Sequence, residues 1–457
     1  MKNMSLAAIA AACNGTYHGD ESLLTKEVSS VVIDSRKVEK DSLFIAIKGA
    51  RVDGHDFIPQ VMEKGALCAL SEKDLGEVPY PYILVESCAP AMKAIAEYYR
   101  KSLNIKVVGI SGSVGKTSTK EMIASVLSQK YNVLKTVGNF NNEIGLPLTI
   151  FNIREEHEIA VLEMGISGFG EMTRLAKMAR PDICVITNIG CVHLENLKDR
   201  DGVLKAKTEM MQYMNPEGSI IFNGNDDKLR SFIPENGIQP TYFGTEDSSY
   251  HAEDIDNQGL RGTTATFITP ESTFRAHISI PGEHMVNNAL AGIAVGRALG
   301  LTDNEIIAGI EALKPLAGRN HLIETENFTI IDDCYNANPI SMKASLDVLA
   351  KADTRTVAIL GDMFELGDNE KPMHYEVGKH AAEAGIQMLI AIGSLAEDIA
   401  KGADDQHKEH PMKIYHFTTK GEFFDSIDNI LNKHDTILVK ASHGMAFAEI
   451  VDVLEKK

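Results

Sequence analysis

A glycine loop between an apolar segment and a helix-forming segment most constrains the fold. Residues 106–110 read Lys-Val-Val-Gly-Ile and predict a buried strand. The loop at 112–117 reads Gly-Ser-Val-Gly-Lys-Thr and matches G-x-x-G-K-T, although Ile110 stands where the longer pattern G-x-x-x-x-G-K-[ST] has a glycine. Apolar residues then recur at helical spacing at Met122, Ile123, Val126 and Leu127. A strand, a glycine loop and a helix in this order predict a phosphate-binding loop in an α/β fold.

The residue types of this loop suit a nucleotide phosphate. Glycines let the backbone amides curl around an anion, and the helix N-terminus adds its positive dipole end. Lys116 offers a positive charge for the β- and γ-phosphates, and Thr117 offers a hydroxyl ligand for Mg²⁺. A chance glycine turn is the alternative, and the order of the three elements argues against it. The expected nucleotide contacts are Gly112, Ser113, Gly115, Lys116, Thr117 and Ser118.

Composition limits what the rest of the chain can be. The 457 residues carry 45 basic and 64 acidic side chains, which give a net charge of −19, and 44% are apolar. This composition excludes a disordered chain and argues against binding of nucleic acid, which needs a positive surface. If the ligands are anionic, the protein must concentrate its cations locally.

Cysteine usage and hydropathy favour a soluble, cytoplasmic protein. The six cysteines are scattered without a C-x-x-C pair, which is typical of reduced thiols. No apolar stretch reaches the roughly 20 residues that cross a bilayer, so no membrane insertion is expected. The alanine-rich run at 5–13 resembles a short signal sequence, but its single preceding lysine favours an opening amphipathic helix.

Strand and helix patterns divide the chain into three α/β units. We predict a small N-terminal α/β domain at 1–100, a central P-loop ATPase-like parallel-sheet domain at 101–317 and a C-terminal Rossmann-like domain at 318–457. An antiparallel pair at 264–268 and 276–280 is expected to extend the central sheet. The other strands expected in the later two units are 106–110, 159–163, 183–187, 218–222, 328–332, 356–360, 388–392 and 436–440.

Three further residues become candidates because of their order behind the loop. Glu163 ends a predicted strand, where nucleotide-binding sheets place a second Mg²⁺ ligand. His193 follows the next strand, and Lys207 lies on a helix after it. Taken singly, these would be a strand-end acid, a structural histidine and a solvated lysine. Thr187-Asn188-Ile189-Gly190 stands where a guanine-specific protein would carry N-K-x-D, which argues against GTP.

At this point the chain resembles the ATP-dependent Mur ligases, which form the peptide bonds of bacterial cell-wall precursors. The resemblance spans nearly the whole chain. Its elements occur in the family's order: the G-x-x-G-K-T loop, Glu163, His193, A-K-x-E-[IM] at 206–210, H-x-x-x-N at 284–288, Gly318-Arg319 and Asp333.

Three long stretches resemble the branch of the family that adds D-alanyl-D-alanine. They are Asp-Asp-Cys-Tyr-Asn-Ala-Asn-Pro at 332–339, Gly-Asp-Met-Phe-Glu-Leu-Gly at 361–367 and Gly-Asn-Phe-Asn-Asn-Glu-Ile-Gly-Leu-Pro at 138–147. Two stretches of the first unit, at 33–36 and 52–57, look like the domain that holds a uridine nucleotide. The resemblance implies that ATP activates the carboxylate of UDP-N-acetylmuramoyl-tripeptide as an acyl phosphate, which D-alanyl-D-alanine then attacks.

The resemblance also implies roles for individual residues in a monomer that uses ATP and two Mg²⁺ ions. Lys116, Glu163, His193 and Lys207 would be catalytic, with Thr117, Glu163 and His193 as metal ligands and Lys207 carbamylated. Asn288 would contact adenine, Arg319 the γ-phosphate, and Asp333 the ribose or hinge; for the last two a surface ion pair is the alternative. The expected substrate contacts are Ser35, Arg36, Asn141, Asn142, Asn336 and Asn338, although a turn or a self-bonded loop would explain the first four.

Two departures and two rival functions stay open. The family's K-G-S-R appears as Lys440-Ala441-Ser442-His443, and Met285 stands where many relatives have asparagine. One rival is another amide ligase of the superfamily, such as a different Mur ligase or a folylpolyglutamate synthase. The other is a nucleotide-dependent binding module with slow ATP hydrolysis. Glu163, His193 and Lys207 together favour an enzyme.

Overall fold

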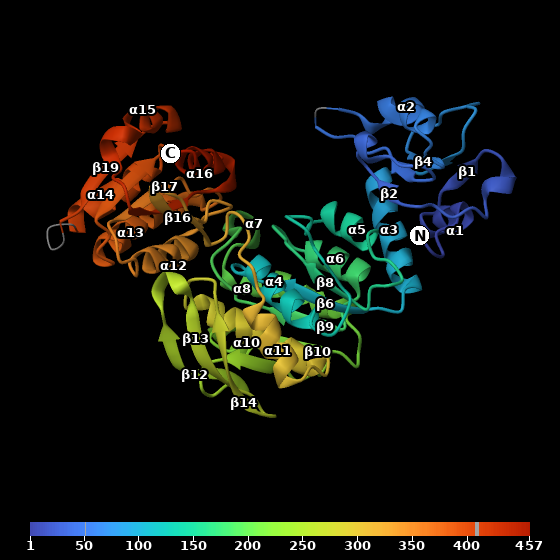
Figure 1. Cartoon of the computed structure of the whole chain (residues 1–457). Helices are drawn as coiled ribbons and strands as arrows, with labels where there is room; N and C mark the ends of the chain where they lie inside the picture. The colour runs from blue at the N-terminus through green and yellow to red at the C-terminus, as the bar shows by residue number, and fades with distance from the viewer. Residues whose placement is uncertain (51, 407–410) are drawn as a thin grey trace.

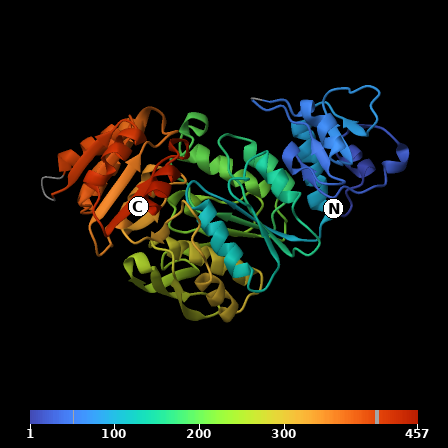
Figure 2. The ribbon, with the colours of Figure 1, turned by 45° about the horizontal axis from the view of Figure 1, so that its top comes forward.

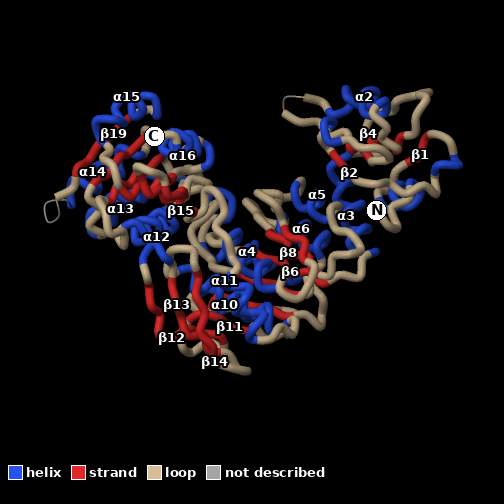
Figure 3. Tube along the Cα trace, in the orientation of Figure 1, coloured by secondary structure: helices blue, strands red, loops and turns tan. Residues whose placement is uncertain are grey.

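Three β-sheets follow one another along the chain. The computed structural model describes residues 1–50, 52–406 and 411–457. The sheets form an arc with the first and third units at its ends, as two views show (Figures 1 and 2). Helices and strands occur together in each of the three units (Figure 3), so the predicted three-part α/β fold class is confirmed. Within the described residues, no helix has the length and apolar character that spanning a membrane requires.

The first unit holds a five-stranded sheet in the order β1-β5-β4-β3-β2, in which only β1 runs antiparallel to its neighbour. Its strands are β1 (Thr16–His18), β2 (Val31–Val32), β3 (Leu43–Ile45), β4 (Cys68–Ser71) and β5 (Tyr82–Leu84), and its helices are α1 (Leu6–Ala12), α2 (Ile58–Glu63) and α3 (Cys88–Ser102). The alanine-rich run forms α1 as predicted, because the Ser5 hydroxyl accepts a hydrogen bond from the amide of Ala8 and caps it.

The central unit holds a nine-stranded sheet in the order β14-β13-β12-β11-β10-β9-β6-β8-β7. The predicted antiparallel addition is confirmed, since β13 pairs antiparallel with both β12 and β14. The strands are β6 (Lys106–Ser111), β7 (Val133–Lys135), β8 (Ile159–Glu163), β9 (Ile183–Ile186), β10 (Ser219–Asn223), β11 (Thr241–Gly244), β12 (Tyr250–Asn257), β13 (Thr263–Ile268) and β14 (Thr273–Ile278). The helices are α4 (Lys116–Leu127), α5 (Gly145–Ile150), α6 (Glu171–Ala179), α7 (Leu194–Leu197), α8 (Arg200–Thr208), α9 (Asp227–Ser231), α10 (His284–Ala298) and α11 (Asp303–Glu311).

The third unit holds a six-stranded sheet in the order β15-β16-β20-β17-β18-β19, with only β15 antiparallel. Separate apolar clusters lie on its two faces, one with α12 to α14 and one with α15 and α16, so the sheet is covered on both sides. The strands are β15 (His321–Glu324), β16 (Phe328–Asp332), β17 (Thr356–Gly361), β18 (Met388–Ile392), β19 (Lys413–Phe417) and β20 (Asp435–Lys440). The helices are α12 (Pro339–Leu349), α13 (Glu370–Glu383), α14 (Ala396–Gln406), α15 (Lys420–Ile430) and α16 (Ala448–Glu455).

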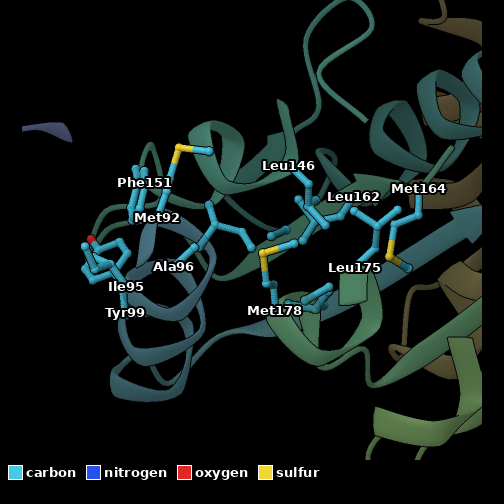
Figure 4. Packing of buried hydrophobic residues seen from close by; sticks show 14 of the residues in the cluster. Met92, Ile95, Ala96, Tyr99, Leu146, Phe151, Leu162, Met164, Leu175 and Met178 are labelled. Carbon is cyan, nitrogen blue, oxygen red and sulfur yellow. The ribbon is translucent and has the colours of Figure 1, made fainter. Parts of the chain in front are cut away.

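Helix α3 joins the cores of the first two units. Its buried apolar residues belong to one apolar cluster, which includes residues from strands of the first sheet and from strands of the central sheet. Figure 4 shows Met92, Ile95 and Tyr99 of α3 beside residues of α5, β8 and α6. The hydroxyl of Tyr99 also donates to the backbone carbonyl of Ile153 at 2.6 Å. The first unit therefore shares a continuous core with the central unit.

Arg100 ties the end of α3 to the central unit. Its Nε donates to the carbonyl of Ala179 at 3.0 Å and its Nη2 to that of Ile105 at 3.2 Å, while the residue is 8% exposed. The variant Arg100→Met should lower the free energy of unfolding by about 3 kcal/mol, because these buried carbonyls lose their donors. A urea titration followed by circular dichroism measures the change. The neighbouring exposed Lys101→Met is the control, and an equal loss in both variants would contradict this role for Arg100.

Candidate active site

The glycine loop forms where the sequence predicts it, at the end of β6. Gly112 and Gly115 have φ values of +152° and +81°, which side chains disfavour. A Cβ atom at Gly112 would lie 1.9 Å from the hydroxyl oxygen of Thr187, so the following segment also excludes a side chain there. The loop then opens α4, whose N-terminus carries Lys116 and Thr117. This geometry is that of a phosphate-binding turn.

Lys116 lies folded over the loop. Its Nζ donates to the carbonyls of Gly112 at 2.8 Å and Ser113 at 3.4 Å. Burial lowers the pKa of Lys116; the Glu163 charge opposes this shift, and the Arg319 charge adds to it. The ammonium is therefore held beside the turn, with an acid and a second cation nearby.

Asn188 holds the same loop from the other side, a role that sequence reasoning missed. Its Oδ1 accepts hydrogen bonds from the backbone amides of Ser113 at 3.1 Å and Val114 at 2.9 Å. Its Nδ2 donates to the carbonyl of Val114 at 3.0 Å, which also accepts from the Thr187 hydroxyl at 2.6 Å. The sequence offered one signal, since Thr187 and Asn188 directly follow a buried strand. The end of β9 thus fixes the shape of the loop.

Removing the hydrogen bonds between Asn188 and the loop should weaken nucleotide binding. The variant Asn188→Ala leaves two loop amides without their side-chain acceptor, so the KM for ATP should rise about 10-fold. The KM values for the other substrates should stay within about twofold. Steady-state kinetics and the dissociation constant of ADP measure the split. The exposed Asn152→Ala, on another loop of the same unit, is the control, and an unchanged ADP affinity in Asn188→Ala would refute the role.

Glu163 and Thr117 face each other beneath the loop. The Thr117 hydroxyl donates to Oε2 of Glu163 at 2.9 Å, and Nδ2 of Asn141 donates to Oε1 at 2.8 Å. Buried Lys120 places its Nζ 3.8 Å from Oε2 of Glu163. A carboxylate and a hydroxyl are hard oxygen donors of the kind that Mg²⁺ prefers, so these residues fit the expected metal.

His193 and Lys207 lie close to each other and to Lys116. Burial lowers the pKa of His193, and the Lys207 charge lowers it further. Burial also lowers the pKa of Lys207 to well below its usual value, and the Lys116 charge adds to the shift. Lys207 is 1% exposed, and its amine forms no hydrogen bond or ion pair with any residue that the structure describes. A lowered pKa increases the share of the neutral amine, which is the nucleophilic form.

Arg319 and Asp333 face the loop from the third unit. The Arg319 guanidinium lies 4.3 Å from the centre of the Tyr335 ring, an arrangement typical of a cation–π contact. Asp333 is buried; its Oδ2 accepts from the Ser345 hydroxyl at 2.6 Å and from the Lys440 ammonium at 2.5 Å. Neither residue forms the surface ion pair that was the alternative prediction. Lys440, absent from the predicted set, comes from the segment that departs from the family pattern.

A cavity of about 450 Å³ lies between the central and third units. Both units supply its walls, so predicted residues that are distant in sequence share one space. The predicted residues that line it are Ser113, Gly115, Lys116, Thr117, Ser118, Asn141, Glu163, Asn288, Arg319, Asp333, Asn336 and Asn338. Other predicted residues are not among the lining residues: Gly112, which receives the Lys116 bond, Asn142, His193, Lys207, Ser35 and Arg36.

Several predicted substrate contacts also have structural partners. Asn142 accepts from the amides of Ile144 and Gly145, as the alternative of a self-bonded loop predicts. Asn338 caps α12, and the carbonyl of Asn336 accepts from Lys440. Oδ1 of Asn288 accepts from the Thr119 hydroxyl at 2.8 Å. The bonds of Asn288 and Asn338 hold their side chains at the cavity wall, and the ligand contacts predicted for all four residues stay predictions.

Ser35 and Arg36 lie apart from this cavity, in a short 3-10 turn of the first unit. The Arg36 guanidinium forms a two-point ion pair with Asp34, at 2.9 and 2.8 Å. These bonds from Arg36 lower the pKa of Asp34 to about 2. The Asp53 and His55 side chains of the other uridine-like stretch bond to each other at 2.6 Å and support the neighbouring turn.

His443, at the departure from K-G-S-R, contacts the same aromatic ring as Arg319. Its ring centre lies 5.4 Å from that of Tyr335. Met285, the other departure, is buried in the apolar core of the central unit, and its sulfur accepts from Nδ2 of Asn288. In the described part of the chain, no group of three histidine, cysteine, aspartate or glutamate residues is arranged to hold a metal by itself.

Comparisons with known proteins identify the family. The models of the Mur ligase family catalytic domain, the Mur ligase middle domain and the Mur ligase glutamate ligase domain match residues 27–110, 110–296 and 318–443. The UDP-N-acetylmuramoyl-tripeptide--D-alanyl-D-alanine ligase of Bacillus subtilis is 38% identical over 94% of this chain and 93% of its own length. The chain belongs to the Mur ligase family. The resemblance predicted from the sequence motifs is thus confirmed.

Other similarities of this Mur ligase extend over its whole length. The enzyme of the same name from Escherichia coli is 33% identical over 100% of this chain and 99% of its own. The structure of MurF from Acinetobacter baumannii has a TM-score of 0.90 at 30% identity and covers 99% of both chains. MurF ligase from Thermotoga maritima in complex with ADP has a TM-score of 0.82 at 30% identity and covers 93% of this chain and 97% of its own. A folylpolyglutamate synthase from Mycobacterium tuberculosis, at 14% identity, shares the fold alone.

Proposed function

We propose that this Mur ligase joins D-alanyl-D-alanine to UDP-N-acetylmuramoyl-tripeptide at the expense of ATP, a step in making peptidoglycan precursors. The observation that carries the proposal is the cavity in which the glycine loop and Glu163 face Arg319 and Asp333. The full-length similarity to ligases named for this reaction supports it, as does the ADP bound by the Thermotoga maritima relative. The proposed location is the cytoplasm, which the use of ATP and of a nucleotide-linked substrate supports, and the proposed active form is a monomer.

Each unit takes one part of the reaction in this proposal. Residues 1–100 bind the uridine nucleotide end of the acceptor, with Ser35 and Arg36 as contacts. Residues 101–317 bind ATP, with Asn141 and Asn142 near the acceptor peptide. Residues 318–457 bind the incoming dipeptide and close over ATP, with Asn336 and Asn338 at the cavity wall.

The first chemical step joins two anions, so its barrier is largely electrostatic. The acceptor carboxylate attacks the γ-phosphorus of ATP, and the bond from that phosphorus to the leaving oxygen of ADP breaks. Lys116 and Arg319 hold positive charge against the transferring phosphoryl group. Mg²⁺ at Thr117 and Glu163, and a second ion at His193, would supply Lewis-acid stabilisation there. Asn288 is proposed to hold the adenine and Asp333 the ribose.

Lys207 is proposed to be carbamylated. An ammonium beside Mg²⁺ would oppose metal binding, whereas a carbamate is an anion that can help to place it. The depressed pKa of Lys207 supports this assignment, because only the neutral amine adds to carbon dioxide. Burial then protects the product from water.

The second step passes the acyl group to the amine. The dipeptide nitrogen adds to the acyl carbon, and the carbon–oxygen bond to phosphate breaks as the tetrahedral intermediate collapses. Water would compete for the same carbon, so the site must be closed while the acyl phosphate exists. The third unit is proposed to close the site, and within it Tyr335 contacts Arg319 and Lys440 bonds to Asp333.

Phosphate release tests the proposal. The purified chain should release phosphate from ATP only when the UDP-linked tripeptide and D-alanyl-D-alanine are both present. A panel of single amino acids in place of the dipeptide separates this activity from that of other ligases of the superfamily. Phosphate release that needs neither substrate would identify a nucleotide-dependent binding module and refute the proposal. Acceptors that differ in the diamino acid at the third peptide position complete the panel.

A further inference from the structure

The incoming dipeptide brings a charge that the described site does not match. Its amino group is an ammonium near neutral pH. Lys116 and Arg319 gather positive charge around the phosphoryl group, which favours the anionic substrates and repels a cation. A carboxylate near the reacting groups that has no lysine or arginine partner could bind this ammonium. That the ligand is this dipeptide rests on the proposed function.

Glu365 of the third unit is such a carboxylate. Its Oε2 lies 3.5 Å from Nδ1 of His193, so it reaches across the cleft to the central unit. Figure 1 shows α7, which directly follows His193, beside the third unit. The Glu365 side chain is 77% exposed, and among the described residues His193 is its one ion-pair partner. Its charge is therefore available to a ligand that binds beside His193.

The loop that carries Glu365 is anchored at each of the three preceding residues. Oδ1 of Asp362 accepts from the amide of Ala396 at 2.7 Å. The amide of Met363 donates to Nε2 of His374 at 2.8 Å, and the amide of Phe364 donates to the Ser442 hydroxyl at 2.9 Å. His374 is fully buried and bonds through Nδ1 to the carbonyl of Glu370 at 2.7 Å. These bonds hold the backbone before Glu365 in one conformation.

Glu365 itself adopts a disfavoured backbone conformation, with φ of +63°. Glutamate has no short side chain that would ease the left-handed region, so the surrounding anchors must maintain it. Leu366 follows, then a short 3-10 turn (Gly367–Asn369), after which α13 begins. The loop thus presents one exposed acid toward His193 at the expense of local strain.

We infer that Glu365 binds the ammonium group of the incoming dipeptide and so positions its nitrogen beside His193. After the ammonium has lost a proton to water, the nitrogen lone pair can attack the acyl carbon. The carboxylate attracts the cationic amine despite the positive charges of Lys116 and Arg319 at the phosphoryl group. It also distinguishes an N-terminal amine from the neutral amide groups of the same molecule. The anchored loop gives the nitrogen a defined position when the third unit closes.

A thermodynamic cycle tests this role. The variant Glu365→Gln keeps the size of the side chain and removes its charge. Its KM for D-alanyl-D-alanine should rise about 10-fold to 100-fold, as expected for loss of a hydrogen bond between charged groups. The inhibition constant of propionyl-D-alanine, which has hydrogen in place of the ammonium group, should be the same in both proteins. The exposed Asp368→Asn in the same loop is the matched control and should leave the KM unchanged.

Hydroxylamine separates this role from the alternatives. It is a neutral nucleophile that captures the acyl phosphate as a hydroxamate, so wild type and Glu365→Gln should form hydroxamate at equal rates. An unchanged KM for the dipeptide would overturn the inference. Equal loss of affinity for propionyl-D-alanine, or slower hydroxamate formation, would also overturn it, by indicating a structural or metal-binding role. Failure of the proposed function is distinct, since wild type itself would then form no hydroxamate.

Discussion

Replacing Lys207 with alanine is expected to lower the rate of the complete reaction by about 100-fold to 1000-fold, the range for loss of a preorganised electrostatic group. Lys207 is buried beside His193 and Lys116, and no other side chain of the described residues bonds to its amine. Phosphate release in the presence of ATP, tripeptide acceptor and dipeptide measures the effect. Excess bicarbonate or a short-chain carboxylic acid should partly restore the rate, because either supplies an anion to the vacated space.

The matched control for this experiment lies two residues away. Lys205 is on the same helix, α8, but is exposed, so Lys205→Ala should keep the wild-type rate. A fully active Lys207→Ala protein would show that the role assigned to Lys207 is wrong. Loss of activity without any rescue by small anions would refute carbamylation.

Replacing Glu163 with glutamine should raise the Mg²⁺ concentration needed for half-maximal activity and lower kcat by about 100-fold. The carboxylate is 2% exposed and is held by Thr117 and Asn141, so the amide should occupy the same place with its charge removed. A neutral oxygen is a weaker ligand for Mg²⁺ than a carboxylate oxygen. Titrations with Mg²⁺ at saturating ATP, monitored through phosphate release, measure both effects.

Glu156→Gln is the control for the Mg²⁺ titration. Glu156 lies just before β8 and is exposed, so its replacement should leave the Mg²⁺ dependence unchanged. If Glu163→Gln needed no more Mg²⁺ than wild type, Glu163 would be excluded as a metal ligand.

Local patterns predicted the parts of the fold that depend on local physics. The strand at 159–163 and the helix in the alanine-rich run at 5–13 were found in place, because burial and helix capping depend on neighbours within a few residues. Two edge strands, β7 and β19, were not predicted. β7 has three residues, and β19 begins with an exposed lysine, so neither carries the apolar run that marks a buried strand.

Many of the residues predicted from motif order line the cavity, but motif order could not reveal how they are held. The hydrogen bonds between Asn188 and the glycine loop join residues more than 70 positions apart in sequence, and the bond between Lys440 and Asp333 joins residues 107 positions apart. Such contacts depend on which strands become neighbours in the folded sheets, and single-sequence periodicity does not contain that information. Glu365 was part of a recognised stretch, yet its exposure and its approach to His193 follow only from the placement of the third unit.

The core that α3 shares with two units bears on which acceptors the enzyme can use. Packing on both sides of this helix keeps the first unit at a constant separation from the glycine loop. In the proposed function the first unit holds the uridine end of the acceptor, so this constant separation sets the distance from the uridine to the γ-phosphate. A peptide shortened by one residue is about 3.5 Å shorter, which is enough to keep its carboxylate from reaching the γ-phosphate. The enzyme could then select acceptors by the length of their peptide, without a side chain that contacts the peptide.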